Sequence, residues 1–290
     1  MSIGLTKINK NMKITEIIEK YSLSSLLEVK RISFFMDKWD SFSLKDMSYN
    51  DRDWLKNNFV SVSLSSYPNL IELDMSGLSF ANICVDFFSS ESLEIISKMG
   101  GKLKLNNSFS GLKKLKEINF GNVLINSLPK DIGKLNKLEK IHLGGTNIKK
   151  LPNSFSDLSS LKKLTLFNKL ENIENIVFPD SIEDIDFRSN KLKTIPVSLC
   201  SLPNLKHLDL GSNPIMEIPL IKNRSLLTFT LTETPVGLLK ANINKMKEFY
   251  EKCEVSGGRN GSYLEDTRSR IYLSATKEFY SNDDFNRLLV

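Results

Sequence analysis

The chain has 290 residues, of which 40% are apolar and 26% charged, and its formal net charge is +6. Because acidic and basic residues are interspersed and no block of Lys or Arg occurs, the composition argues against a nucleic-acid-binding protein. The cysteines Cys84, Cys200 and Cys253 lie far apart, which indicates neither a disulfide framework nor a paired metal site.

The N-terminal residues 1–18 contain neither the apolar core nor the small-residue cleavage site of a secretory signal peptide. No stretch approaches the ~18 apolar residues of a membrane span. We therefore expect a reducing, cytoplasmic environment and no contact with a membrane. Delivery into a host cell without such a signal peptide stays open as an alternative.

Residues 13–56 are predicted to be helical, because Ile14, Ile17 and Ile18 recur at the spacing of one helical face. An array of repeats exposes an apolar cross-section at each end and needs a cover. The sequence therefore predicts a helical N-terminal cap over residues 1–65.

A repeated phrase begins near Leu70 and becomes regular from Leu115. It reads LKEINFGNVLINSLP at 115–129, LEKIHLGGTNIKKLP at 138–152, IEDIDFRSNKLKTIP at 182–196 and LKHLDLGSNPIMEIP at 205–219. The first two copies start 23 residues apart, as do the last two, whereas the segment 93–112 is irregular. A fixed period in the twenties is typical of a solenoid.

Within each copy, the pattern L-x-x-L-x-L predicts a short strand whose apolar residues point inward and whose intervening residues face outward. Adjacent strands are expected to pair in parallel. Asn190 and Asn213 follow their strands, where a buried amide can satisfy backbone groups that a tight turn leaves unpaired. Thr146 and Thr234 hold the same position in other copies and are expected to do part of this.

A Leu-Pro or Ile-Pro step follows and fixes an extended backbone on the outer side. Apolar pairs after this step are predicted to fill the core from a short helical or irregular segment. The pairs are Ile132 and Leu135, Phe155 and Leu158, and Leu199 and Leu202.

The repeats are expected to end near Thr234, which with Pro235 has the form of a helix N-cap followed by proline at the first helical position. Apolar residues at three- to four-residue steps from Val236 to Tyr250 predict a C-terminal capping helix over 236–253.

Residues 254–290 contain a glycine-rich hinge and a tail. A strand is expected at 270–274 and a short helix over 282–290. The tail is expected to dock back on the solenoid, with contact to a partner and an export signal as the alternatives.

We call each L-x-x-L-x-L segment a comb. The combs, the asparagine positions and the proline steps together resemble the leucine-rich repeat superfamily, in its 23-residue form L-x-x-L-x-L-x-x-N-x-L-x-x-L-P. The resemblance covers roughly residues 66–237. It implies an α/β solenoid over 66–235, a right-handed horseshoe of about seven to eight repeats with a parallel concave β-sheet and helical caps.

Leucine-rich repeats are a general protein-recognition scaffold. The resemblance therefore implies a non-enzymatic module that binds a protein partner on the concave face. Similar repeats occur in bacterial proteins, including effectors delivered into host cells, so a secreted bacterial effector that uses the same face is an alternative.

Signals for catalysis are weak. The chain lacks GxxxxGK[ST], HExxH and GxSxG motifs. Its two histidines, His142 and His207, have no Cys or second His at ligand spacing, so we expect no metal and no cofactor. A small enzyme built on residues 254–290 around Cys253 is disfavoured, because so short a segment rarely forms a core of its own.

Outward strand positions are the candidate binding residues, because the fold does not use their side chains. They are Asn119, His142, Thr165, Phe167, Asp184, Asp186, Arg188, His207 and Asp209. Phe167, interpreted as an exposed aromatic, and Arg188 are expected to be the anchors, since aromatics and arginine are enriched at binding hot spots. The alternative is that Phe167 covers a register shift at Asn168.

Acidic residues gather around these two anchors, while Lys140, Lys162 and Lys163 lie toward the N-terminal side. This segregation of charge predicts a protein partner of mixed, complementary charge and argues against a nucleic-acid backbone. We expect the chain to be a monomer.

Overall fold

The chain divides into two compact units, Met1–Ile148 and Lys149–Val290. The computed structural model describes residues 31–33, 53, 56–57, 59–64, 67–86, 90–105, 108–109, 111–167, 169–216, 219, 223, 225–231, 234–235, 270–272 and 279–280.

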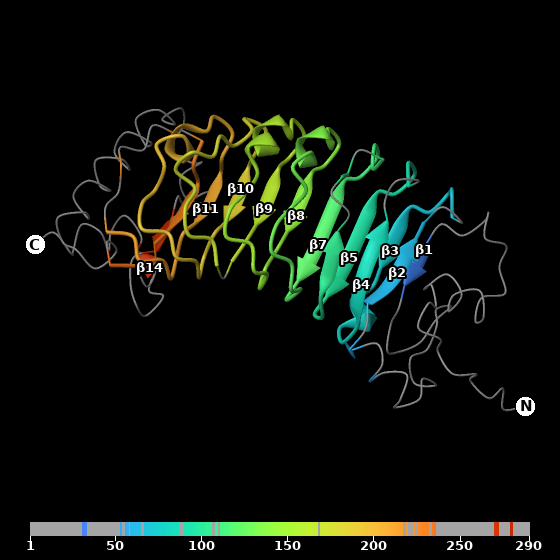
Figure 1. The fold of residues 1–290 in the computed structure, drawn as a ribbon. Helices are drawn as coiled ribbons and strands as arrows, with labels where there is room; N and C mark the ends of the chain where they lie inside the picture. Colours follow the sequence, from blue (N-terminus) through green and yellow to red (C-terminus); the bar gives the residue numbers. More distant parts are fainter. Residues whose placement is uncertain are drawn as a thin grey trace, which may run out of the picture. The chain divides into compact units, whose positions relative to one another are not determined.

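The first unit contains a parallel sheet made of one strand from each turn of the chain. Its order is β1 (Arg31–Ser33), β3 (Glu72–Asp74), β5 (Ile95–Met99), β7 (Glu117–Gly121) and β8 (Lys140–His142). Equivalent comb residues lie opposite one another, as Ile96, Ile118 and Ile141 do in β5, β7 and β8. These strands lie side by side in Figure 1.

Strand β1 corrects part of the helical cap predicted over 13–56. The described residues of that segment are helical at 53 and 56, but 31–33 is a strand in register with β3. An edge strand has unpaired N–H and C=O groups, and a pairing strand satisfies them where a helix would not. An ion pair of 2.6 Å between Arg31 and Glu72 accompanies this register.

A second parallel sheet runs through the first unit, with the order β2 (Phe59–Ser63), β4 (Asn82–Asp86) and β6 (Leu103–Leu105). In the turn that contains β3, the 3-10 helix η2 (Ser76–Leu78) leads from the first sheet to the second. The segment that is irregular in sequence, 93–112, therefore contributes β5 to one sheet and β6 to the other.

A pair of glycines allows the tight turn between β5 and β6. Gly100 and Gly101 have φ values of 61° and 65°, in the left-handed region. A Cβ atom at Gly101 would overlap the carbonyl oxygen of Ala81. Only glycine fits this turn without strain.

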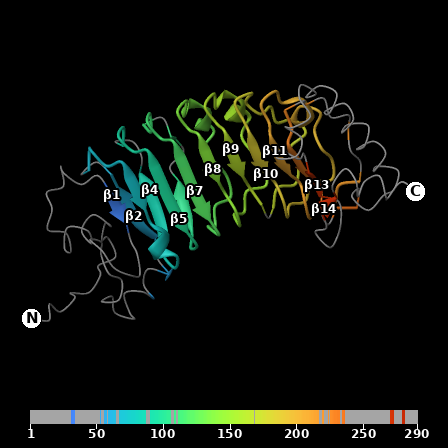
Figure 2. The same ribbon diagram turned by 180° about the vertical axis from the view of Figure 1, so that it is seen from behind.

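The second unit continues the same design. Strands β9 (Lys163–Thr165), β10 (Asp184–Asp186), β11 (His207–Asp209), β12 (Thr228–Thr230) and β13 (Arg270–Tyr272) pair in parallel, and β14 (Phe279–Tyr280) pairs antiparallel with β13. Figure 2 shows β9, β10 and β11 from behind, side by side as in Figure 1.

The strand predicted at 270–274 is confirmed at 270–272, and it docks on the sheet by pairing with β12. The predicted capping helix 236–253, the hinge 256–262 and the short helix 282–290 lie outside the described residues.

The interior of each unit is filled by the comb residues. Leu115, Leu138, Leu161 and Leu205 are each fully buried. The apolar pairs after the proline steps are also buried, and each begins in a short 3-10 helix as predicted: η3 (Ile132–Lys134), η4 (Asn153–Asp157) or η5 (Leu199–Ser201). In the second unit, Phe178 contacts the rings of both Phe155 and Phe187, with ring centroids 6.4 and 5.9 Å apart.

The predicted asparagine role is confirmed. The Nδ2 of Asn190 donates to the Leu166 and Phe187 carbonyls at 2.7 and 2.9 Å, and its Oδ1 accepts from the Leu170 N–H at 2.9 Å. Asn213 makes equivalent bonds one turn later.

Threonine takes over part of this role at the same position in other turns. The Thr146 hydroxyl donates to the Leu143 carbonyl, and the Thr234 hydroxyl donates to the Leu231 carbonyl, at 3.0 and 2.6 Å. Each unit is therefore a parallel-strand solenoid with internal polar ladders. The horseshoe curvature and the helical caps stay predictions.

Candidate functional site

The strands of the second unit present an outward face that the core does not use. Along β10 and the residues after it, Ile185 and Phe187 point inward and are buried, whereas Arg188 is exposed. The register places Asp186 between Thr165 of β9 and Asp209 of β11. Side chains from neighbouring turns thus form columns on this face.

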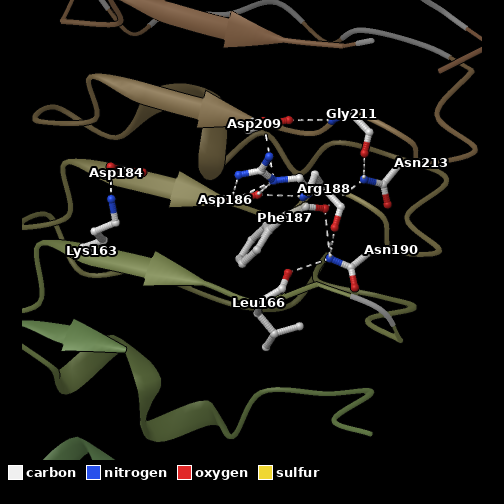
Figure 3. A network of polar contacts seen from close by, with 10 residues as sticks. All are labelled: Lys163, Leu166, Asp184, Asp186, Phe187, Arg188, Asn190, Asp209, Gly211 and Asn213. Atoms are coloured by element: carbon white, nitrogen blue, oxygen red, sulfur yellow. Dashed lines mark hydrogen bonds and ion pairs between the residues drawn. The ribbon is translucent and has the colours of Figure 1, made fainter. Parts of the chain in front are cut away.

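Arg188 lies at the centre of a charged cluster on this face, with Asp186 and Asp209 as its neighbours (Figure 3). Its Nε is 3.0 and 2.9 Å from the two carboxylate oxygens of Asp186, and its Nη2 is 2.6 Å from Oδ2. Asp209 Oδ2 is 3.9 Å from the Arg188 Nε, too far for a hydrogen bond. The guanidinium is therefore committed to Asp186 and only weakly neutralises Asp209.

Burial differs among these three side chains. The side chain of Arg188 is 58% exposed, that of Asp209 29% and that of Asp186 13%. The hydrogen bond with Asp186 raises the pKa of Arg188. Burial raises the pKa of Asp209, and the negative charges of Asp186 and Asp184 raise it further, although the Gly211 N–H bonded to its Oδ1 at 2.9 Å opposes them. Asp209 is thus a poorly compensated carboxylate on a partly exposed surface.

Two of the acidic residues near Arg188 form ion pairs with lysines of neighbouring turns, and the predicted segregation of charge stays a prediction. Lys163 of β9 forms a 2.9 Å ion pair with Asp184 of β10, and Lys206 forms one of 2.6 Å with Glu183. The repeat register therefore brings oppositely charged residues about one period apart into contact. Each exposed pair adds at most about 1 kcal/mol to stability.

Phe167 and His207 flank the charged cluster. Phe167 is half-buried, rather than exposed as expected, and it takes part in further contacts. His207 is exposed, and its Nδ1 lies 2.8 Å from the Thr228 hydroxyl oxygen. Thr165 is buried and lies in the same column as Asp186, as its register partner on β9.

The two remaining predicted residues, Asn119 and His142, belong to the first unit. They are register partners on β7 and β8, and both are half-buried. The predicted set is thus divided between the units, and seven of the nine residues lie in the second: Thr165, Phe167, Asp184, Asp186, Arg188, His207 and Asp209.

Met99 is a surface residue that the sequence interpretation missed. It is 37% exposed at the end of β5, and its thioether occupies the space that a side chain at Gly121 would need. The signal was its position, since Met99 aligns with Phe167 and Arg188 in the repeat. The irregular spacing of its turn hid that alignment.

The described histidines, cysteines and carboxylates do not indicate catalysis. No group of three or more of them in the described part of the chain is arranged to hold a metal ion. Burial raises the pKa of the Cys200 thiol to about 12, so this cysteine is an unreactive core residue. Cys84 is half-buried. None of the helices in the described part is long and apolar enough to cross a membrane.

A family model for the leucine rich repeat matches residues 167–215, the stretch that contains the charged cluster and both ladder asparagines. Residues 167–215 are therefore identified as leucine-rich repeats. A comparison with curated protein sequences finds no match.

Several solved leucine-rich repeat structures are similar to this chain. A protein from Leptospira interrogans is 18% identical, with a TM-score of 0.49 over 84% of this chain and 69% of its own length. An internalin, inlF, from Listeria monocytogenes is 15% identical, with a TM-score of 0.48 over 80% of this chain and 77% of its own. TLR13, in a complex with ssRNA13, is 22% identical, with a TM-score of 0.45 over 60% of this chain and 32% of its own.

Proposed function

We propose that this leucine-rich repeat protein is a non-catalytic interaction module that binds a protein partner on the outward strand face of its second unit. The observation that carries the proposal is the cluster of Asp186, Arg188 and Asp209. These side chains stand on the strand face, and the solenoid core is complete without them.

The charges of the cluster indicate what the partner presents. Asp184 is paired with Lys163 and Asp186 with Arg188, which leaves Asp209 as the excess negative charge. A Lys or Arg of the partner would pair with Asp209 Oδ2, and a partner carboxylate would accept from the Nη1 of Arg188, which makes no bond within the described part of the chain. The excess negative charge disfavours a nucleic-acid backbone.

The rigidity of the face favours binding. Strands β10 and β11 are hydrogen-bonded on both sides, and Arg188 is held by Asp186. A surface that is already ordered loses little conformational entropy when a partner docks, so more of the contact free energy appears as affinity.

The test is affinity capture from lysate with quantitative mass spectrometry, followed by measurement of the dissociation constant for the captured protein. The baits are wild type, Arg188→Ala and Asp209→Asn. The control is Lys193→Ala, an exposed lysine of the second unit that lies outside the strands. All baits are used at a temperature at which circular dichroism shows each of them to be fully folded.

Each cluster substitution is expected to weaken binding by ~2 kcal/mol, a value typical of a hot-spot residue, while Lys193→Ala binds as wild type does. If both cluster variants retain wild-type affinity for every captured protein, the strand face of the second unit is not the binding surface.

A further inference from the structure

Within the part of the first unit that the structure describes, one charged residue occupies a buried, inward-facing position of the comb. This residue is Lys98. Its side chain has no exposed surface. It is the sixth residue of its turn, where the neighbouring turns have Met75 and Phe120, both also fully buried.

Among the described residues, the ammonium of Lys98 bonds only backbone oxygens. Its Nζ donates to the Leu78 carbonyl at 2.9 Å and to the Met99 carbonyl at 3.4 Å. These acceptors come from the preceding turn and from its own turn. Asn213 of the second unit also bonds one carbonyl of the preceding turn and one of its own, Phe187 and Leu210. These are the sixth residues of their turns, whereas Leu78 is the ninth residue of its turn and Met99 the seventh.

The turn of β5 has no side chain at the position that follows three residues after Lys98. The position that Asn213 holds in its turn is held by Gly101 in the turn of β5. Glycine has no side chain to bond the turn carbonyls, and the left-handed backbone with its close contact to Ala81 excludes a larger residue. The Lys98 side chain adds hydrogen bonds between two turns from inside the core, to a Leu78 carbonyl that also accepts from the Ala81 N–H and to the Met99 carbonyl.

No described carboxylate compensates the charge. On β3, Asp74 is at an outward position, where its Oδ1 accepts from the Ser76 N–H at 2.9 Å. On β7, Glu117 faces outward and pairs with Lys140 at 3.7 Å. On β6, Lys104 is exposed, and η2 contains no charged residue.

We propose that Lys98 makes the stability of the first unit respond to pH. Deprotonation removes the buried charge of Lys98 but leaves the hydrogen bonds by which its side chain supports the turn. A neutral amine still carries two N–H donors for the two carbonyls. Loss of the proton therefore keeps both bonds and removes the unfavourable burial of a charge.

The direction of the effect follows from proton linkage. Burial lowers the pKa of Lys98 from the ordinary 10.5 to about 8. Between these values the unfolded chain binds more protons than the folded one, so stability rises with pH in this window. From about pH 7 to about pH 9.5, Lys98 should lower the unfolding equilibrium constant about 30-fold, which corresponds to about 2 kcal/mol.

The experiment compares the full chain with Lys98→Met and Lys104→Met by urea unfolding at both pH values, followed by far-UV circular dichroism. Met occupies the equivalent core position at Met75, and Lys104 is an exposed lysine on β6. Wild type and Lys104→Met are expected to show the additional 30-fold change, and Lys98→Met to lack it. Equal pH responses in all three proteins overturn the proposal.

A second measurement does not depend on the variant folding. In wild type labelled with ¹³C at lysine Cε, one lysine resonance is expected to titrate near pH 8, well before the others. If every lysine titrates near the ordinary value, the proposal is wrong.

Discussion

Replacement of Asn213 by Ala should destabilise the second unit by more than the loss of a small polar side chain usually does. Asn213 is 2% exposed and bonds the Leu192 N–H together with the carbonyls of Phe187, Leu210 and Gly211.

Not all of these groups lose their only partner. The Phe187 carbonyl also accepts from Asn190, and the Gly211 carbonyl also accepts from the Ser189 N–H. The Leu192 N–H and the Leu210 carbonyl depend on Asn213 alone among the described residues. A buried polar group without a partner costs about 1–3 kcal/mol, so the two together predict a loss of roughly 2–6 kcal/mol.

Urea unfolding followed by circular dichroism measures this loss. Asn175→Ala, at an exposed asparagine of the same unit, is the matched control and should change stability by less than about 0.5 kcal/mol. Asn213→Thr should recover part of the loss, because Thr146 and Thr234 bond their own turn's carbonyl from the same position. The reasoning fails if Asn213→Ala matches the control, or if Thr restores nothing.

Three further substitutions test other parts of the structure. Asp209→Asn should increase thermal stability at neutral pH, because a carboxyl with a raised pKa destabilises the folded state once it is ionised in both the folded and the unfolded chain. The gain should vanish as pH falls below the ordinary pKa of 3.8, and a gain that persists there contradicts the pKa argument. Gly145→Ala should destabilise the first unit by ~1 kcal/mol or more, since φ is 73° and a Cβ would overlap the Asn122 side chain; an unchanged urea midpoint would show that the turn relaxes. Phe155→Ala should lower the free energy of unfolding by about 3–5 kcal/mol, because the ring is fully buried against Phe178, and a loss near 1 kcal/mol would mean that the core collapses into the space.

The sequence alone determined the repeating architecture from Leu115 onward. Inward and outward positions follow from the local alternation of the comb, so the strands from β7 to β12, the buried leucines and the 3-10 segments could all be predicted. The ladder role of Asn190 could also be predicted, because a polar residue at a fixed place after each strand has few other uses. These features depend on residues close together in the chain.

Tertiary structure decided what depends on pairing between distant segments. Strand β1 is recognisable only through its register with β3, and the second sheet only through the pairing of β2, β4 and β6. The sequence placed Arg188 and Asp209 on one face. It could not show that Arg188 is committed to Asp186, because that depends on atomic distances in the folded chain, 2.6 Å to Asp186 against 3.9 Å to Asp209.

Lys98 is a single residue that shows the same difference between what the sequence determines and what the tertiary structure decides. By composition it is one of many lysines, and a lysine is usually solvated. The fold places it in the core because the comb continues through its position, and the Leu78 and Met99 carbonyls accept from its Nζ there. Local periodicity determined which way each side chain points, whereas only the contacts between turns decided which charges are compensated and which are buried alone.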